Sequence, residues 1–306
     1  MRSSTLRTGA LLGAMAVGAL LPGAHVAAGA IRWLIITLLF LVFLQTPLRL
    51  NIVHRSHGWL VVANVAMSGA GWLAGWLIGG RDVALALFFA GITPTATAAP
   101  VIVGFLKGRV DYVVAAFLIT NFSIAIALPV LLPFVIGRIE PALFLQVFSS
   151  VAQVVFAPLI AAWVVRRIHP PAKAWPERLQ GFSFTLWLIS LFLITANTSH
   201  FVRTPPVAPV ALLFKIGTLT ALLCAANFWL GRRIGGVHFG REASQSLGQK
   251  NTTFTLYLAL TYASPLVALG PTFYILWHNL WNSWQLHRGT PRSSPESLTP
   301  PMPGRS

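Results

Sequence analysis

Apolar residues run along nearly the whole chain in segments of roughly 20 residues, and short polar or charged joints separate them. A segment of this length crosses a hydrocarbon core about 30 Å thick as a helix. The strict alternation typical of membrane β-barrel strands is absent from the sequence. The pattern predicts ten transmembrane helices near residues 9–28, 31–48, 58–80, 83–106, 110–136, 141–165, 180–201, 207–230, 240–263 and 265–286.

The ten predicted spans form a single transmembrane domain over residues 1–286. Two halves of five spans cover about 9–136 and 141–286, and halves with an odd number of spans must lie in opposite orientations. Residues 287–306 are rich in Pro and Ser and predict a disordered cytoplasmic tail. We therefore expect an all-α membrane protein built from two inverted five-helix repeats.

The fourth and ninth spans are interrupted by residues that disturb a membrane helix. The fourth contains "TPTATAAP", where Pro94 and Pro100 each lack an amide hydrogen, so nearby carbonyls lose partners. The ninth contains "ASQSLGQKNTTFT", residues 243–255, which brings polar side chains to membrane depth. Such residues either kink the helices or break them around a cavity. We expect breaks near residues 93–100 and 246–252 that cross each other.

The two interruptions occupy the fourth position of each half, and broken helices at matching positions indicate the binding site of a secondary transporter. A polar patch in the fifth span, Thr120, Asn121 and Ser123, is expected to bind substrate or to tie helices together. The predicted substrate-binding residues are Thr93, Pro94, Thr95, Thr97, Asn121, Ser246, Gln249, Asn251 and Thr252.

Lys250 lies at the centre of the ninth span, where a lysine is costly and indicates a functional site. We expect its ammonium to bond either carbonyls freed by the fourth-span break or the side chains of Ser246 and Asn251. Because an amine is titratable, Lys250 is our candidate for coupling transport to protons. Alternatives are direct attraction of an anionic substrate and snorkelling to an interface. Lys215, in the eighth span, has no surrounding motif.

Composition excludes a soluble domain, because 56% of the 306 residues are hydrophobic, 9% are charged and the mean hydropathy is +0.73. The net charge is +16, and the Lys and Arg residues concentrate on alternate joints and at both termini. This distribution is typical of the cytoplasmic loops of a membrane protein, so membrane topology explains the charge. We expect both termini on the cytoplasmic side of the inner membrane, with lipid rather than nucleic acid as the partner of the basic residues. The opposite side carries Arg32, Arg81, Arg138 and Arg203.

Residues 9–28 follow Arg2 and Arg7 and also fit a secretory signal, but we expect them to be retained as the first span, because removal would leave nine spans. The single cysteine, Cys224, cannot form an internal disulfide. Motifs of metalloproteases, serine hydrolases and P-loop enzymes are absent, as is any Cys/His cluster with metal-ligand spacing. We expect no catalytic activity, no cofactor and no metal.

Two segments resemble the bile acid:sodium symporter family. In residues 91–110, "GITPTATAAPVIVGFLKGRV", Pro94 and Lys107-Gly108 match at the family's spacing. The segment "SLGQKN", Ser246 to Asn251, is similar to the family's Glu-x-Gly-x-Gln-Asn signature and keeps Gly248 and Asn251. The resemblance implies sodium-driven uptake of organic anions by a core of crossed broken helices beside a panel of flanking spans.

Departures from the family pattern remove the ligands that the resemblance implies for two sodium sites. Sodium is a hard cation that prefers carboxylate and other oxygen ligands. We therefore expect no sodium at these sites. The departing positions are Ala99-Pro100 for Ser-Asn, Val113 and Phe117 for Ser and Thr, Ser246 for Glu and Lys250 for Gln.

These features favour a secondary transporter of a small organic anion that works by uniport, exchange or proton coupling. An efflux carrier of the arsenite or auxin exporter type is an alternative, since it shares the ten-span plan. A non-transporting membrane sensor or assembly factor is an alternative of another class. The sequence indicates neither the substrate nor the direction of transport nor the oligomeric state.

Overall fold

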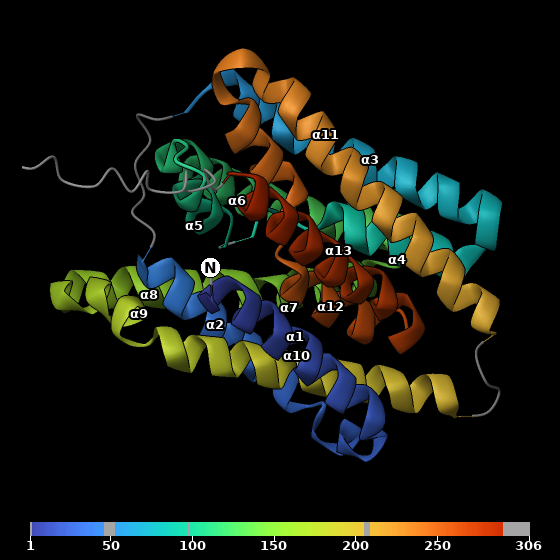
Figure 1. Ribbon diagram of the computed structural model, residues 1–306. Coiled ribbons are helices and arrows are strands. Elements are labelled where there is room, and N and C mark those ends of the chain that lie inside the picture. The colour runs from blue at the N-terminus through green and yellow to red at the C-terminus, as the bar shows by residue number, and fades with distance from the viewer. Residues whose placement is uncertain (1, 46–52, 97, 205–208, 290–306) are drawn as a thin grey trace, which may run out of the picture.

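A computed structural model describes residues 2–45, 53–96, 98–204 and 209–289. Its regular elements are all helical within these ranges, as predicted (Figure 1). Five of the helices are long and apolar enough to cross a membrane, which agrees with a multi-pass membrane protein. These are Arg55–Gly79, Val110–Ile136, Pro141–Ile168, Gly181–Phe201 and Val210–Gly248.

Most helices overlap the predicted apolar segments, but η4 and α9 form in the predicted joint between residues 165 and 180, and α11 continues through the predicted joint between residues 230 and 240. In chain order they are α1 (Arg2–Leu20), η1 (Pro22–Ala27), α2 (Ala30–Gln45), α3 (Arg55–Gly79), α4 (Arg81–Ile92), α5 (Ala98–Phe105), α6 (Val110–Ile136), α7 (Pro141–Val151), η3 (Ala152–Phe156), α8 (Ala157–Ile168), η4 (Pro170–Ala174), α9 (Trp175–Arg178), α10 (Gln180–Arg203), α11 (Val210–Gly248), α12 (Thr252–Tyr262) and α13 (Pro265–Gly289).

Two predicted boundaries were wrong. The first apolar segment does not continue as an α-helix to residue 28, because α1 ends at Leu20 before the 3₁₀ turn that starts at Pro22. The last helix continues to Gly289, so residues 287–289 are helical rather than part of a tail. The rest of the predicted tail lies outside the described residues.

The sixth predicted span is continuous but contains one widened turn. The segment Ala152–Phe156 is π-helical and joins α7 to α8. Pro158 is the second residue of α8, and its ring would clash with the carbonyl of residue 154 in a regular α-helix. The wider turn relieves this clash and lets the span continue to Ile168.

The helix labelled α11 in Figure 1 turns back on itself between the eighth and ninth predicted spans. Gly236 has φ of 59° and Phe239 has φ of −131°, so the helical dihedral angles are interrupted there. A positive φ is accessible to glycine without steric cost. The reversal separates an upstream arm from a downstream arm, residues 240–248, which ends at the ninth-span interruption.

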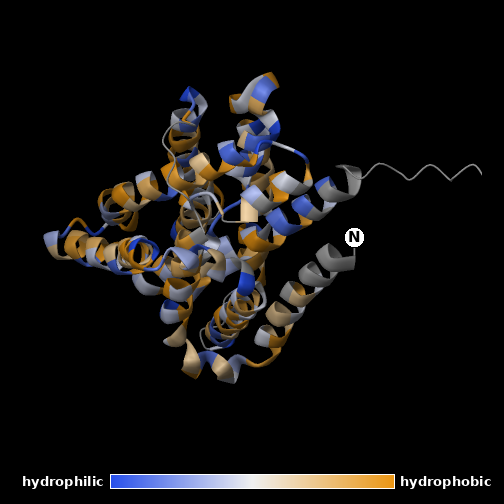
Figure 2. Ribbon diagram, turned by 90° about the vertical axis from the view of Figure 1, so that its left-hand side faces the viewer, coloured by the Kyte–Doolittle hydropathy of each residue, from blue (hydrophilic) through white to orange (hydrophobic). Residues whose placement is uncertain are grey.

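The helices form two groups, and the members of each group pack against one another. One contains α3, α4, α11 and α13, and the other contains α1, α2, α8 and α10 (Figure 1). Residues 83–92 of α4 are all buried, as expected for a helix that is apolar on every side. Hydrophobic residues occur along most of the helices seen in Figure 2, and side chains such as Leu77 and Phe214 are more than 70% exposed.

Close packing of α4 on α3 depends on Gly91. A Cβ atom at this position would lie 2.6 Å from the Ser68 Cα, so the two backbones could not keep their present separation. We expect Gly91→Ala to destabilise the protein by about 1–3 kcal/mol, which lowers the thermal midpoint in detergent by several degrees. Gly69→Ala is the control, because a Cβ there meets nothing within 4 Å. Equal midpoints for the two variants would contradict this packing.

Candidate functional site

The two interrupted helices meet and bond to each other through their main chains. The first interruption separates α4 from α5, and the second separates α11 from α12. The amide of Asn251 donates to the Pro94 carbonyl at 2.8 Å, and the amide of Ala96 donates to the Gln249 carbonyl at 2.9 Å. These bonds form an isolated antiparallel bridge, which we call the crossing. The helices are thus interrupted within the predicted ranges 93–100 and 246–252, and the two interruptions meet.

Threonine side chains satisfy backbone groups that the first interruption leaves without helical partners. The Thr93 hydroxyl donates to the Phe89 carbonyl at 2.6 Å and lies 2.6 Å from the Thr255 hydroxyl of α12. The Thr95 hydroxyl donates to the Ser246 carbonyl at 2.6 Å. Thr93 and Thr95 therefore supply hydrogen bonds that the broken helices lack and link the two helices to each other.

The polar patch of α6 holds the first interruption in place. The Thr120 hydroxyl accepts from the Thr95 amide at 3.2 Å and donates to the Thr95 hydroxyl at 2.9 Å. The amide group of Asn121 donates to the Thr95 carbonyl at 2.9 Å. Of the two roles expected for this patch, the structure supports helix tying for Thr120 and Asn121.

Lys250 projects from the second interruption into the interior, and the residue is only 2% exposed. Its Nζ donates to the Asn64 Oδ1 of α3 and to the Gly91 carbonyl of α4, the latter at 3.0 Å. Asn64 in turn donates its Nδ2 to the Ile92 and Thr93 carbonyls at 3.1 and 3.2 Å. Lys250 and Asn64 thus donate hydrogen bonds to three successive carbonyl oxygens at the end of α4, those of residues 91–93.

The structure separates the alternatives proposed for Lys250. Its partners are the Gly91 carbonyl next to the fourth-span break and the Asn64 side chain, whereas Ser246 instead donates to the Glu242 carbonyl at 2.8 Å. The expectation that Ser246 and Asn251 side chains bond the ammonium was wrong. Snorkelling is contradicted by the burial of Lys250. Lys215 does behave as a peripheral lysine, because it is exposed and donates to the Ile78 carbonyl at 3.0 Å.

The ends of four helices determine the electrostatics of the crossing. The carboxyl ends of α4 and α11 and the amino ends of α5 and α12 all lie beside it. A helix carboxyl end carries partial negative charge and favours a cation. Among the described residues, no carboxylate lies within 4.0 Å of Lys250. Helix ends and carbonyl dipoles therefore stabilise its ammonium without an ion pair.

Two buried donors at the crossing have no hydrogen-bond partner among the described residues. They are the Gln249 Nε2 and the Asn251 Nδ2. Buried polar atoms are nearly always paired in native proteins, so these donors are suited to bind an oxygen of a ligand or water. Of the predicted substrate residues, Thr97 lies outside the described residues, and the structure brings together Thr93, Pro94, Thr95, Asn121, Ser246, Gln249, Asn251 and Thr252.

Three positions that the family resemblance assigns to sodium ligands are buried among apolar side chains of the protein. Ala99 and Val113 are fully buried in one apolar cluster with Leu247. Phe117 is 2% exposed and belongs to the main apolar cluster. Side-chain oxygens are therefore lacking at these three positions. Within the described residues, no group of three His, Cys, Asp or Glu side chains could hold a metal ion.

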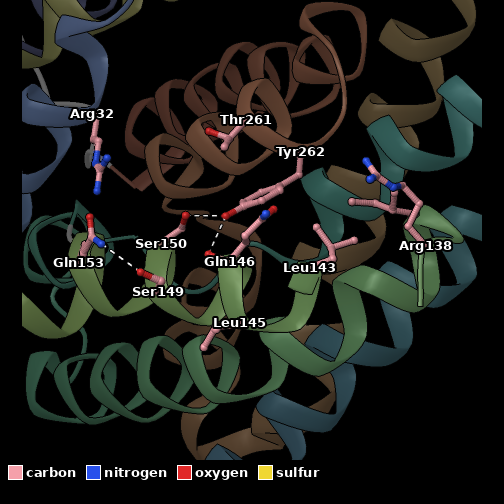
Figure 3. Close-up of a pocket in the computed structure, with 11 residues that line it drawn as sticks. Arg32, Arg138, Leu143, Leu145, Gln146, Ser149, Ser150, Gln153, Thr261 and Tyr262 are labelled. Carbon is pink, nitrogen blue, oxygen red and sulfur yellow. Dashed lines mark hydrogen bonds between the residues drawn. The ribbon is translucent and has the colours of Figure 1, made fainter. Parts of the chain in front are cut away.

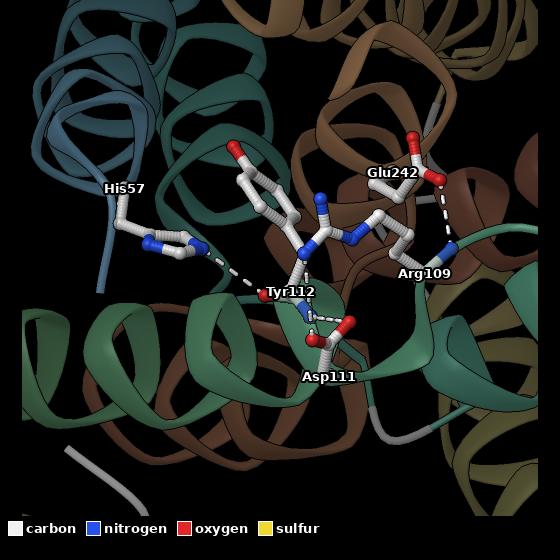
Figure 4. A network of polar contacts seen from close by, with 5 residues as sticks. All are labelled: His57, Arg109, Asp111, Tyr112 and Glu242. Carbon is white, nitrogen blue, oxygen red and sulfur yellow. Dashed lines mark hydrogen bonds and ion pairs between the residues drawn. The ribbon is translucent and has the colours of Figure 1, made fainter. Parts of the chain in front are cut away.

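A second polar network lies where α6 begins (Figure 4). The buried Glu242 of α11 accepts from the Arg109 amide at 2.8 Å, and Asp111 accepts from the Tyr112 amide at 2.9 Å. The His57 Nε2 lies 3.1 Å from the Tyr112 carbonyl. This network fastens α3, α6 and the downstream arm of α11 together at one end of the molecule.

Sequence reasoning missed Asn64, the side-chain partner of Lys250. Its signal was present, since Asn64 is the one amide side chain in the apolar run of residues 58–80. That run has no proline or polar cluster to mark a break, so the pattern predicts an ordinary span. A lone polar residue at membrane depth needs a partner, and here the partner comes from 186 residues further along the chain.

Comparison with known proteins gives no match, either to a protein family or to a curated protein. The resemblance to bile acid:sodium symporters therefore rests on the two motifs alone.

The contact between Asn64 and Lys250 predicts a coupled effect on stability. We expect Asn64→Ala to lower the free energy of unfolding by about 1–3 kcal/mol, because the Lys250 ammonium and two carbonyls lose a partner. In a double-mutant cycle with Lys250→Met, the two changes should be non-additive by at least about 0.5 kcal/mol. Unfolding of the purified protein in detergent measures both.

Asn279→Ala provides the matched control for this cycle. Asn279 also donates to a main-chain carbonyl within a helix, that of Ile275 at 2.8 Å, but it does not bond Lys250. Its combination with Lys250→Met should be additive. Additive behaviour of the Asn64 pair as well would show that the lysine is not held by Asn64.

Proposed function

We propose that this protein is a secondary transporter that carries a small organic anion across the membrane. The observation that carries the proposal is the main-chain pairing of two interrupted helices around the buried Lys250. Irregular backbone at membrane depth is tolerated only where protein or a wet cavity surrounds it, and matched interruptions are typical of transporters with inverted repeats. We further propose the ten-span plan, with both termini on the cytoplasmic side of the inner membrane.

Helix lengths support ten spans rather than the five continuous ones. The helices α4 and α5 contain 12 and 8 residues, which corresponds to about 18 and 12 Å. Neither can cross a core of about 30 Å alone, but together with the five residues between them they can. The downstream arm of α11 and α12 form a second such pair. The group formed by α1, α2, α8 and α10 would then be the flanking panel that the family resemblance implies.

In this proposal Lys250 supplies the positive charge that a sodium ion supplies in the family that the chain resembles. Its ammonium holds the carboxyl end of α4 through Gly91 and Asn64. The free amide donors of Gln249 and Asn251 are suited to the oxygens of an anion. A proton on Lys250 would be the coupling ion, with uniport and exchange as the other modes. An efflux carrier would use the same residues, and no observation favours it over uptake.

The first test concerns sodium. Because Lys250 occupies the crossing and apolar residues fill the corresponding ligand positions, we expect no specific effect of sodium on stability. Thermal midpoints of the purified protein in sodium and potassium at equal ionic strength should agree. A clear stabilisation by sodium over potassium would show that main-chain carbonyls suffice to bind it, and the assignment of the cation role to Lys250 would be wrong.

The second test concerns transport itself. Proteoliposomes containing the protein should take up members of a labelled organic-anion panel under a proton gradient, with no requirement for a sodium gradient. We expect Lys250→Gln and Lys250→Arg to reduce uptake at least about tenfold, because glutamine lacks the charge and a planar guanidinium does not fit a compact cation site. Lys215→Gln removes the same charge from an exposed lysine and should retain uptake within about twofold.

The uptake assay is informative between about pH 5.5 and 8.5, a window that brackets neutrality. Normal uptake by Lys250→Gln across this window would exclude Lys250 as the coupling residue. Absence of uptake of every anion by the unmodified protein, in either direction of the gradient, would favour the sensor or assembly-factor alternative.

A further inference from the structure

A pocket lies at the opposite end of α6 from the network of Figure 4. Its volume is about 590 Å³, which falls in the range of about 300–1,000 Å³ typical of small-molecule sites. The end of α6, the start of α2, the segment α7–η3 and the end of α12 supply its walls (Figure 3). Thr120, at the crossing, is 16 residues before Ile136 of the pocket, or about 24 Å along the helix. The pocket is therefore separate from the crossing.

Arg32 is the most distinctive residue of this pocket. It comes from the first turn of α2, and Figure 3 shows its guanidinium pointing toward Gln153 on the opposite wall. The Nε atom of Arg32 is buried and has no hydrogen-bond partner among the described residues. A buried guanidinium donor without an acceptor is costly, so this geometry calls for an anionic partner.

The other arginines of the same predicted joints have their charges partly compensated. Arg81 and Arg203 each donate to a main-chain carbonyl, at 2.7 and 2.9 Å. Arg138, also in the pocket wall, lies 3.8 Å from Glu140. Within the described residues Arg32 has neither a hydrogen bond nor an ion pair, and its guanidinium carbon lies 5.9 Å from the centre of the Trp33 ring. Arg32 is thus the arginine whose charge remains available to a ligand.

The remaining walls fit the rest of a small organic acid. Ile136 and Leu143 are buried apolar side chains that can contact hydrocarbon. The Tyr262 hydroxyl is fixed, because it lies 2.5 Å from the Ser150 hydroxyl and donates to the Gln146 carbonyl at 2.8 Å. A pocket with one available guanidinium, a second arginine at its rim and a partly apolar wall matches a carboxylate attached to a short hydrocarbon group.

We propose that this pocket binds a small organic carboxylate, with Arg32 as its principal anchor and Arg138 as a secondary one. Binding itself is independent of the transport proposal, whereas its role as the place where substrate first binds rests on that proposal. A route between the two sites exists in α12, which begins beside Asn251 at the crossing and ends at Tyr262 in the pocket wall.

Equilibrium binding to the purified full-length chain tests this pocket. The probes are radiolabelled phenylacetate, octanoate and glutarate, with the neutral amide of each as a competitor that lacks the charge. Binding is measured in the unmodified chain and in Lys250→Gln, where the crossing has lost its cation. We expect saturable binding of at least one acid in both chains, displaced by the acids and not by the amides.

Matched arginine variants in the Lys250→Gln background assign the binding to the pocket. Arg32→Gln should weaken binding by about 10- to 100-fold, because a charge-assisted hydrogen-bond pair is lost. Arg138→Gln should weaken it less than about fivefold, since this arginine is exposed and lies near Glu140. Arg203→Gln removes a similar charge from a residue that does not line the pocket and should leave binding unchanged. Arg32→Lys keeps the positive charge but loses the planar guanidinium that can donate two parallel hydrogen bonds to a carboxylate, and it should give an intermediate affinity.

Three results would overturn the pocket proposal. The first is the absence of saturable acid binding in Lys250→Gln, and the second is equal affinity of Arg32→Gln, Arg32→Lys and Arg203→Gln. The third is displacement of the probe when nanodiscs of phosphatidylcholine are replaced by nanodiscs containing phosphatidylglycerol, which would assign the site to an anionic lipid headgroup. If the chain binds the acids as expected but shows no uptake, the pocket proposal stands and the transport proposal is wrong. Binding and uptake therefore test the two proposals separately.

Discussion

The structure depends on one constraint, which is that backbone polar groups at membrane depth must find partners within the protein. Prolines and polar residues interrupt two helices and leave amides and carbonyls without helical bonds. The chain pairs the two interruptions with each other, through Asn251 to Pro94 and Ala96 to Gln249. Neither interrupted helix could satisfy its backbone alone, so each break requires the other.

Lys250 offsets the partial negative charge of the helix carboxyl ends at this crossing. Two helix carboxyl ends lie side by side and present carbonyl oxygens to a site without a nearby carboxylate among the described residues. A covalently attached ammonium neutralises this partial charge and cannot diffuse away, unlike a bound ion. Asn64 completes the arrangement because its amide can donate to carbonyls and accept from the lysine at once.

The helix α6 connects three polar regions that lie along its length. Its first turn joins the network around Glu242, its middle bonds the first interruption through Thr120 and Asn121, and its end forms a wall of the Arg32 pocket. Rigid helices are suited to hold such groups at fixed separations. The proposed transport function would require motion of this frame relative to the panel formed by α1, α2, α8 and α10.

Local properties of the sequence determined the helical class, most helix positions and the two breaks, because hydrophobic length, Pro94 and the polar run around Lys250 act within a few residues. The sequence also marked Lys250 itself, since burial of a lysine is costly wherever it occurs. Tertiary structure alone decided its partners: Asn64 and Gly91 lie far from Lys250 along the chain and meet it only when α3, α4 and α11 pack. The pocket around Arg32 likewise arises from four separate segments, and no local pattern specifies how such distant segments pack together.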